Sequence, residues 1–171
     1  MLSRCWIDET ALSDLLAEAR RWRLRETGGA LLGWRDGADV AVACVLGPGP
    51  DARHRLRSFE PDGPWQVAQG RRIYAATSRT VAYLGDWHTH PFGWPTPSGQ
   101  DEKAARQIAE DADFRTAEPL SGIVGRAPRG RPRLVMHAWD GEALTPIETI
   151  SCGLERELID QAHGAVARLA P

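Results

Sequence analysis

The feature that most constrains this chain is an apolar stretch that leads into two histidines one residue apart. Residues 81–84 predict a buried strand, and His88 and His90 follow it closely. Residues i and i+2 of an extended chain point the same way, so both imidazoles are expected on one face. A loop rich in Pro and Gly follows at 91–97, and such turns fix geometry. The pattern predicts a strand that ends in a paired-histidine site.

A serine and an aspartate follow this loop, where a helical pattern begins. Ser98 is expected to cap the helix, and Asp101 lies three residues further along the chain. Two imidazoles and one carboxylate are the kinds of ligand that zinc prefers, and a catalytic zinc keeps its fourth position for water. The pattern therefore predicts a catalytic zinc site formed by His88, His90 and Asp101.

Such a site needs a base for the water, and Glu26 is the natural upstream candidate. It lies at a predicted helix end beside Gly28 and Gly29, where the backbone can approach another strand closely. A carboxylate there would take a proton from the water and pass it to the leaving amine. The metal would lower the pKa of its water towards roughly 7 and polarise the carbonyl. Ser98 is expected to donate a hydrogen bond to the oxyanion.

Together these residues resemble the signature of the JAMM metallopeptidases, the catalytic MPN-domain family. That signature is a Glu, then H-x-H, seven residues, S, two residues and D. The resemblance implies that His88, His90 and Asp101 bind zinc, that Glu26 is the general base and acid, and that Ser98 donates to the oxyanion. It also implies an MPN-type, cytidine-deaminase-like fold, and cleavage after the C-terminal glycine of a ubiquitin-like protein.

Small bacterial members of this kind resemble deconjugating peptidases of antiphage operons, which also encode activating and conjugating enzymes. The resemblance therefore implies a ubiquitin-like protein or its conjugate as partner. Two alternatives stay open. One is a processing peptidase that trims a ubiquitin-like or sulfur-carrier precursor to its terminal glycines. The other is a non-catalytic MPN scaffold, although such scaffolds usually lose metal ligands and none is missing here.

Other metal motifs fit the sequence less well. Metallo-β-lactamases continue as H-x-H-x-D-H, but position 92 is Phe92. Amidohydrolases begin a barrel of about 200 or more residues with H-x-H, and this chain has 171 residues. A structural zinc would need a fourth protein ligand, and none is suitably spaced.

Three further residues near the histidines are candidate substrate contacts. Trp87 and Trp94 flank the loop and are expected to pack at the core or rim, or else to form walls for a Gly-Gly tail. Thr89 is expected to point away from the metal. A basic hairpin at 126–133 is either a solvated tip or a docking patch for an acidic partner. His54, His137 and His163 lack metal-like spacing and are expected to be ordinary strand or surface residues.

The remaining pattern predicts one mixed α/β domain over residues 1–171, a mixed sheet flanked by helices. Expected strands lie at 6–7, 30–34, 40–46, 54–59, 81–84, 120–125, 134–139 and 144–150. Helices are expected at 9–23, 65–76 and 99–111, with a C-terminal helix at 152–170.

Composition and charge limit the kinds of binding partner and the cellular compartment that we expect for this chain. The net charge of −2 gives no field that would attract nucleic acid. No apolar run approaches about 18 residues, so no membrane span or signal segment is expected. The three cysteines are widely spaced and form no C-x-x-C pair, so they are expected to be small hydrophobic residues. A reducing cytoplasm is the expected compartment.

Overall fold

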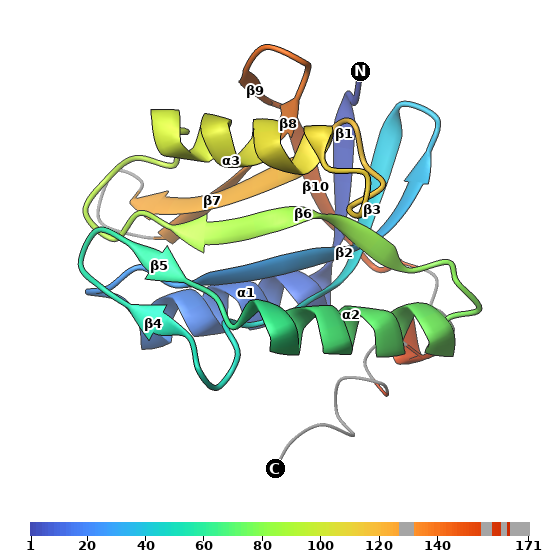
Figure 1. Cartoon of the computed structure of the whole chain (residues 1–171), viewed down its shortest axis with the longest axis horizontal. Helices are drawn as coiled ribbons and strands as arrows, with labels where there is room; N and C mark the ends of the chain where they lie inside the picture. The colour runs from blue at the N-terminus through green and yellow to red at the C-terminus, as the bar shows by residue number, and fades with distance from the viewer. Residues whose placement is uncertain (127–131, 155–158, 162–163, 165–171) are drawn as a thin grey trace.

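The computed structural model describes residues 1–126, 132–154, 159–161 and 164. Its main element is an eight-stranded mixed sheet, which confirms the predicted fold class (Figure 1). The strands are β1 (Arg4–Asp8), β2 (Gly28–Asp36), β3 (Asp39–Val45), β6 (Ala82–Thr89), β7 (Leu120–Arg126), β8 (Pro132–Trp139), β9 (Leu144–Pro146) and β10 (Glu148–Cys152). Their spatial order is β10-β1-β3-β2-β6-β7-β8-β9. The strand that carries the histidines, β6, therefore lies at the centre.

Strand direction follows from the connections. β2 and β3 form a hairpin and pair antiparallel, as do β2 with β6 and β7 with β8. β6 and β7 are joined through a helix and pair in parallel. The carboxyl ends of β6 and β7 therefore meet at one edge of the sheet, where the histidines lie.

Helices cover both faces of the sheet. α1 (Glu9–Arg21) begins at Asp8, whose carboxylate accepts hydrogen bonds from the backbone of the first turn. Its apolar stripe packs into a core with Leu31 of β2 and Val42 of β3. α2 (Gly63–Ala76) packs on the opposite face in a second core around Leu32 and Ile73. Figure 1 shows α1 behind the sheet and α2 in front of it.

α3 (Gly99–Glu110) forms a smaller cluster with Trp139 of β8. Trp139 follows Ala138, which faces the α1 core, and successive strand residues point to opposite faces. α3 therefore packs on the same face of the sheet as α2. This places the start of α3 close to the end of β6.

Some predicted elements are wrong. Residues 54–59 do not form one edge strand: β4 (Arg53–His54) and β5 (Phe59–Glu60) make a separate two-stranded ribbon. Residues 144–150 are divided between β9 and β10, which lie at opposite edges of the sheet. Pro146 ends β9, since proline cannot donate to a further ladder. The chain then crosses to pair in parallel with β1.

Not every apolar residue of α2 and α3 faces the core. Val67 on α2 is 52% exposed, and Ala104 on α3 points to solvent. Ile73 and Ala105 make the buried contacts of these two helices instead. A spacing of three or four residues identifies a helix, but it does not fix how wide the buried stripe is.

The C-terminal helix was predicted to begin at residue 152, but Cys152 belongs to β10. Residues 159–161 and 164 are helical, and Ile159 is buried in the second core. The rest of that predicted helix lies outside the described residues. Cys5 and Cys44 are free and buried, as expected, and Cys152 is half-buried. Within the described part of the chain, no helix has the length and apolar character needed to cross a membrane.

Candidate metal centre

The two histidines lie where β6 ends between β2 and β7. His88 is opposite Gly28 on one side and Ile123 on the other. His90, one residue past the strand, donates its backbone N–H to the Val124 carbonyl at 2.8 Å, so it keeps the strand direction. The two imidazole centroids are 4.8 Å apart. The structure therefore brings both rings to one side, as a spacing of two requires.

A backbone contact fixes the orientation of the His90 ring. Its Nδ1 lies 3.3 Å from the carbonyl oxygen of Trp94 in the following loop. Only a protonated Nδ1 can donate to that oxygen, so Nε2 keeps its lone pair. This loop packs closely on β7, where a side chain at Gly125 would overlap the backbone of Trp94 and Pro95. The loop thus holds His90 in the tautomer that binds a metal through Nε2.

Ser98 and Asp101 form the first turn of α3 as a capping box. The Asp101 carboxylate accepts hydrogen bonds from the backbone N–H of Ser98 at 2.6 Å and from its hydroxyl at 2.7 Å. Burial alone would raise the pKa of Asp101, but hydrogen bonds and charge from His88, together with Ser98, lower it well below its usual range. The carboxylate is therefore ionised and held towards the histidines.

The donor atoms of these residues converge on one point. Nε2 of His88 lies 3.1 Å from Nε2 of His90 and 3.2 Å from Oδ1 of Asp101. Nε2 of His90 lies 3.6 Å from Oδ2 of Asp101. Ligands about 2.0–2.1 Å from a tetrahedral zinc are roughly 3.3 Å apart, so separations of this size suit two imidazoles and one carboxylate that share a single ion. It is the one group of His, Cys, Asp and Glu within the described residues with such spacing.

Burial and charge favour neutral imidazole at this point. Burial lowers the pKa of His90, and the neighbouring His88 lowers it further, while Asp101 and the Trp94 carbonyl oppose the shift. A metal ligand must be the neutral imidazole. The lowered pKa therefore favours the neutral form of His90, which can bind a metal cation, over the protonated form, which cannot.

Glu26 lies in the loop between α1 and β2 and is half-buried. The next residue, Thr27, bonds to Thr89 of β6 through its backbone N–H and its carbonyl, at 3.0 and 2.8 Å. Burial raises the pKa of Glu26, repulsion from Asp101 adds to the shift, and attraction to His88 opposes it. The Glu26 carboxyl therefore interacts electrostatically with two residues of the ligand cluster.

The two glycines after Glu26 permit this approach. A side chain at Gly28 would overlap the Trp87 carbonyl, and one at Gly29 would overlap the Leu46 carbonyl. The strands on both sides of β2 therefore pack against its bare backbone. The sequence-based argument for close approach at these glycines is confirmed.

One residue beside Glu26 was not singled out by the sequence. His54 of β4 lies with its Nδ1 3.0 Å from the Glu26 carbonyl oxygen, and its ring stacks on Trp22 at 3.5 Å. Phe59 covers the imidazole at 5.3 Å. No motif connects His54 to Glu26; the aromatic residues near it in sequence were the only available signal. His137 is a buried strand residue, and His163 lies outside the described residues.

The three predicted substrate contacts lie in different environments. Trp87 is 1% exposed and donates its indole N–H to the Leu46 carbonyl, so it packs in the core and cannot form a channel wall. Thr89 is buried, with its hydroxyl bonded to the Thr27 backbone. Trp94 is 63% exposed on the loop after His90. Only Trp94 is thus open to a substrate from the solvent side.

Comparison with known proteins shows similarity to one protein family. A profile of the prokaryotic homologs of the JAB domain matches residues 8–140. A probable metalloprotease of Sinorhizobium fredii is 33% identical over 139 residues, which cover 80% of this chain and 83% of the relative. A CD-NTase/cGAS isopeptidase of Pseudomonas aeruginosa is 34% identical, over 72% of this chain and 77% of the relative. One of Enterobacter hormaechei is 28% identical, over 72% and 68%.

The fold comparison agrees with this result. The solution structure of a protein from Desulfitobacterium hafniense superposes with a TM-score of 0.68 at 21% identity. The match covers 90% of this chain and 96% of that protein. It shows a shared fold.

Proposed function

This chain belongs to the prokaryotic homologs of the JAB domain and is a JAMM-type metallopeptidase, and we propose from this premise that it is a zinc-dependent isopeptidase. The bond it cleaves would follow the C-terminal glycine of a ubiquitin-like protein, releasing that protein from its target. The observation that carries the proposal is the convergence of His88, His90 and Asp101 on one point, within electrostatic reach of Glu26.

His88, His90 and Asp101 would hold the metal through two neutral imidazoles and one ionised carboxylate. When bound, a zinc ion supplies a Lewis acid that polarises the carbonyl group and lowers the pKa of a water molecule to roughly 7. Three protein ligands leave one coordination position open, as catalytic zinc sites do. This ligand set distinguishes the site from a closed structural one.

Glu26 would move the proton. It takes a proton from water as the hydroxyl group adds to the carbonyl carbon, and it gives that proton to the nitrogen as the C–N bond breaks. The products are a carboxylic acid and a free amine. The raised pKa of Glu26 suits this exchange, because a base whose pKa lies nearer to neutrality also returns its proton readily.

Ser98 would have two roles. Its hydroxyl orients Asp101 in the structure, at 2.7 Å. We propose that the same hydroxyl turns to the oxyanion during catalysis, where one donor commonly contributes about 10²–10³ in kcat. Capping by the Ser98 backbone N–H, which bonds to Asp101 at 2.6 Å, would keep the helix start in place.

The modifier that is released has a second candidate. Two relatives of this chain bear the name CD-NTase/cGAS isopeptidase. A CD-NTase/cGAS protein, instead of a ubiquitin-like protein, is therefore the second candidate for the protein that is released from the conjugate. Activating and conjugating enzymes of an antiphage operon are then the proposed partners that make the conjugate. A processing peptidase that trims a precursor would use the same residues.

The test is to assay Glu26→Gln on an isopeptide-linked conjugate of either modifier. We expect cleavage to fall by at least about 10²-fold, because the proton acceptor is lost, while zinc content measured by mass spectrometry is unchanged. His88→Ala should lose both zinc and activity. Parallel assays on a precursor with residues beyond Gly-Gly separate deconjugation from processing.

Glu110→Gln is the matched control, because Glu110 is exposed at the far end of α3. It should cleave at the wild-type rate. Cleavage by Glu26→Gln at the wild-type rate would show that Glu26 is not the base. A wild-type protein that purifies without metal and cleaves nothing would support the scaffold alternative.

A further inference from the structure

An aspartate stands on the sheet face that carries the metal ligands, two residues before the first of them. Trp87, which separates Asp86 from His88, is buried in the core on the α1 side. Successive strand residues point to opposite faces, so Asp86 and His88 both point away from that core. Each strand residue rises by about 3.3 Å, which places Asp86 about 6.5 Å from His88 along β6. Asp86 is therefore the next side chain beside the candidate metal centre on this face.

Asp86 is exposed, although it lies on a central strand of the sheet. The residues opposite it on the neighbouring strands, Ala30 of β2 and Ser121 of β7, are buried. Figure 1 shows β6 passing between α2 and α3 on this face, with neither helix lying across it. A polypeptide bound at the metal centre can therefore reach Asp86 from solvent.

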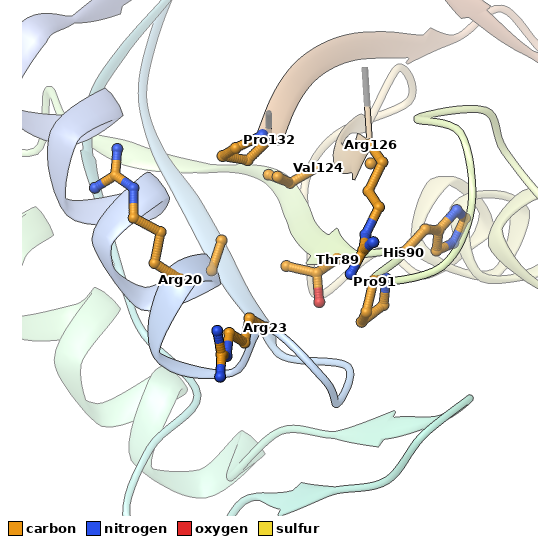
Figure 2. Close-up of a pocket in the computed structure, with 10 residues that line it drawn as sticks. Arg20, Arg23, Thr89, His90, Pro91, Val124, Arg126 and Pro132 are labelled. Atoms are coloured by element: carbon orange, nitrogen blue, oxygen red, sulfur yellow. The ribbon is translucent and has the colours of Figure 1, made fainter. Parts of the chain in front are cut away.

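The arginines near His90 lie on the other face of the sheet. Arg20, Arg23 and Arg126 line a cleft whose wall also includes Val124, a residue of the α1 core. Figure 2 shows this cleft beside α1, with the His90 ring turned away from it. A substrate at the metal centre therefore lies on the side of Asp86 and not on the side of these arginines.

The Asp86 carboxylate has a fixed orientation but no cationic partner. It accepts a hydrogen bond from the Tyr83 hydroxyl at 2.9 Å, and it forms no ion pair with a described residue. Desolvation by the surrounding protein raises its pKa to about 6, while the Tyr83 hydrogen bond and attraction to His88 oppose the rise, so the carboxyl is ionised at neutral pH. Aspartate is disfavoured within strands, so its presence on β6 indicates a role other than folding.

Two aromatic rings lie next to this carboxylate. The Tyr83 ring, whose hydroxyl orients Asp86, lies 5.2 Å from the ring of Phe114. Phe114 follows α3 in the chain and is 39% exposed. A carboxylate beside an aromatic surface suits a Lys or Arg side chain, because the apolar stem can pack on the rings while the cationic head binds the carboxylate.

We propose that Asp86, Tyr83 and Phe114 form a subsite for a Lys or Arg side chain of the cleaved polypeptide. The inference rests on the proposed function and specifies the chemistry of its substrate. An extended substrate also spans about 3.3 Å per residue, so in a chain laid along β6 a side chain two or three residues from the scissile bond comes opposite Asp86. That side chain belongs either to the residue just before a terminal Gly-Gly or to a residue of the target beside the modified lysine.

The experiment measures binding of fluorescein-labelled peptides to the zinc-loaded Glu26→Gln chain at neutral pH, so that cleavage does not interfere. One pair ends in Arg-Gly-Gly or Gln-Gly-Gly. A second pair carries Gly-Gly on the ε-amine of a lysine that has either arginines or glutamines beside it. In one pair we expect the arginine peptide to bind about tenfold more tightly than the glutamine peptide, with a preference that decreases as salt is added. The pair that shows this preference identifies which side of the scissile bond lies over Asp86.

Two substitutions test the residues of the subsite. Asp86→Asn should abolish the preference, because the amide keeps an acceptor for the Tyr83 hydroxyl but loses the charge. Its zinc content, measured by mass spectrometry, should be unchanged. Phe114→Ala should weaken binding of the arginine peptide by about threefold and leave the glutamine peptide unaffected, because only the cationic side chain packs on the ring.

Asp36→Asn is the matched control, since Asp36 is exposed at the end of β2 remote from Gly28. It has the same charge change and should keep the preference. Equal binding within both pairs of peptides, or an equal loss of preference in Asp36→Asn, would overturn the proposal. So would a loss of zinc from Asp86→Asn, since Asp86 would then act through the metal ligands and not through the substrate.

Cleavage assays on wild type separate this inference from the proposed function. If conjugates with arginine and with glutamine at both tested places are cleaved equally fast, the function stands and the cationic subsite is wrong. If the arginine peptide binds through Asp86 but no conjugate is cleaved, the subsite stands and the isopeptidase function is wrong.

Discussion

At the scale of single residues, the site depends on which nitrogen of His90 carries the proton. The Trp94 carbonyl accepts from Nδ1 at 3.3 Å, so Nε2 is the nitrogen free to bind a metal. Hydrogen bonds of this kind usually accompany histidine ligands and fix their tautomer. The contact comes from the backbone, so it persists whatever side chain stands at position 94.

The first prediction concerns the pH dependence of zinc binding. The pKa of His90 is lowered by burial and by His88, so the neutral, ligating form dominates above that pKa and is lost as the pH falls through it. We expect zinc affinity to be level near neutral pH and to fall only at a pH below the ordinary histidine pKa of about 6.5, because the lowered pKa keeps His90 neutral to a more acidic pH. Competition with a chromophoric chelator across the pH range measures this.

Glu26→Gln provides the comparison for this measurement, because Glu26 is not proposed as a ligand. Its pH profile of zinc affinity should match wild type. An affinity that stays level down to about pH 5 would contradict binding through His90.

A second prediction concerns Trp94, the exposed aromatic residue of the loop. Trp94→Ala keeps the carbonyl that orients His90 but removes a 63% exposed indole beside the site. We expect KM to rise by about tenfold, with kcat and zinc content unchanged, because the ring contacts substrate only. Steady-state kinetics on a conjugate measure both constants.

Val67→Ala is the control for Trp94, since Val67 is 52% exposed on α2 and should leave KM unchanged. A lower kcat with an unchanged KM would show that Trp94 positions the site rather than binding substrate.

At the scale of elements, the β4–β5 ribbon supports the loop that carries Glu26. The Glu26 backbone N–H donates to the Arg55 carbonyl at 2.8 Å, and the His54 ring contacts the Glu26 carbonyl at 3.0 Å. Arg25 donates to the His54 carbonyl at 3.2 Å. The ribbon therefore holds the backbone of the proposed base on both sides, while its carboxyl forms no hydrogen bond or ion pair with another described residue.

This arrangement predicts that His54 is a positioning residue. His54→Phe keeps a ring to stack on Trp22 but removes the donor to Glu26. We expect kcat to fall by about tenfold with KM and zinc content unchanged, because small displacements of a catalytic group are costly. His54→Asn keeps a donor near the position of Nδ1 and should recover much of the rate.

The comparison of the two variants decides the role of His54. If the Asn variant is no faster than the Phe variant, the hydrogen bond to Glu26 does not position the base. Thermal unfolding of both variants shows whether loss of stacking, rather than loss of the donor, causes any effect.

At the scale of the whole molecule, two cores on opposite faces of the sheet hold β2 beside β6. Leu31 is fully buried in the core under α1. Leu31→Ala should reduce the free energy of unfolding by about 2–5 kcal/mol, because it leaves a cavity in a close-packed interior. Denaturant unfolding followed by circular dichroism measures the change.

Leu56→Ala is the matched control, because Leu56 is 61% exposed. It should change stability by no more than about 0.5 kcal/mol. A Leu31→Ala variant as stable as wild type would show that this core does not determine the fold's stability.

The fold class and most elements could be predicted because they have local signals. Apolar periodicity identified α1, β2, β3, β7 and β8, and Ser98 acts as the predicted cap of α3. The strands β4 and β5 have two residues each, which is too short to show an alternation of apolar and polar residues. β10 pairs with β1, although almost the whole chain lies between these two strands in sequence, and no local pattern encodes such a pairing.

The sequence by itself determined the chemistry of the site: two imidazoles on one face, and a capping box that orients Asp101, because both follow from the fixed geometry of a strand and of a helix start. Only the tertiary structure decided that Trp87 is in the core and that His54 contacts the backbone of Glu26. The reason is that these contacts depend on strand register across the sheet, where Thr27 meets Thr89 from 62 positions away.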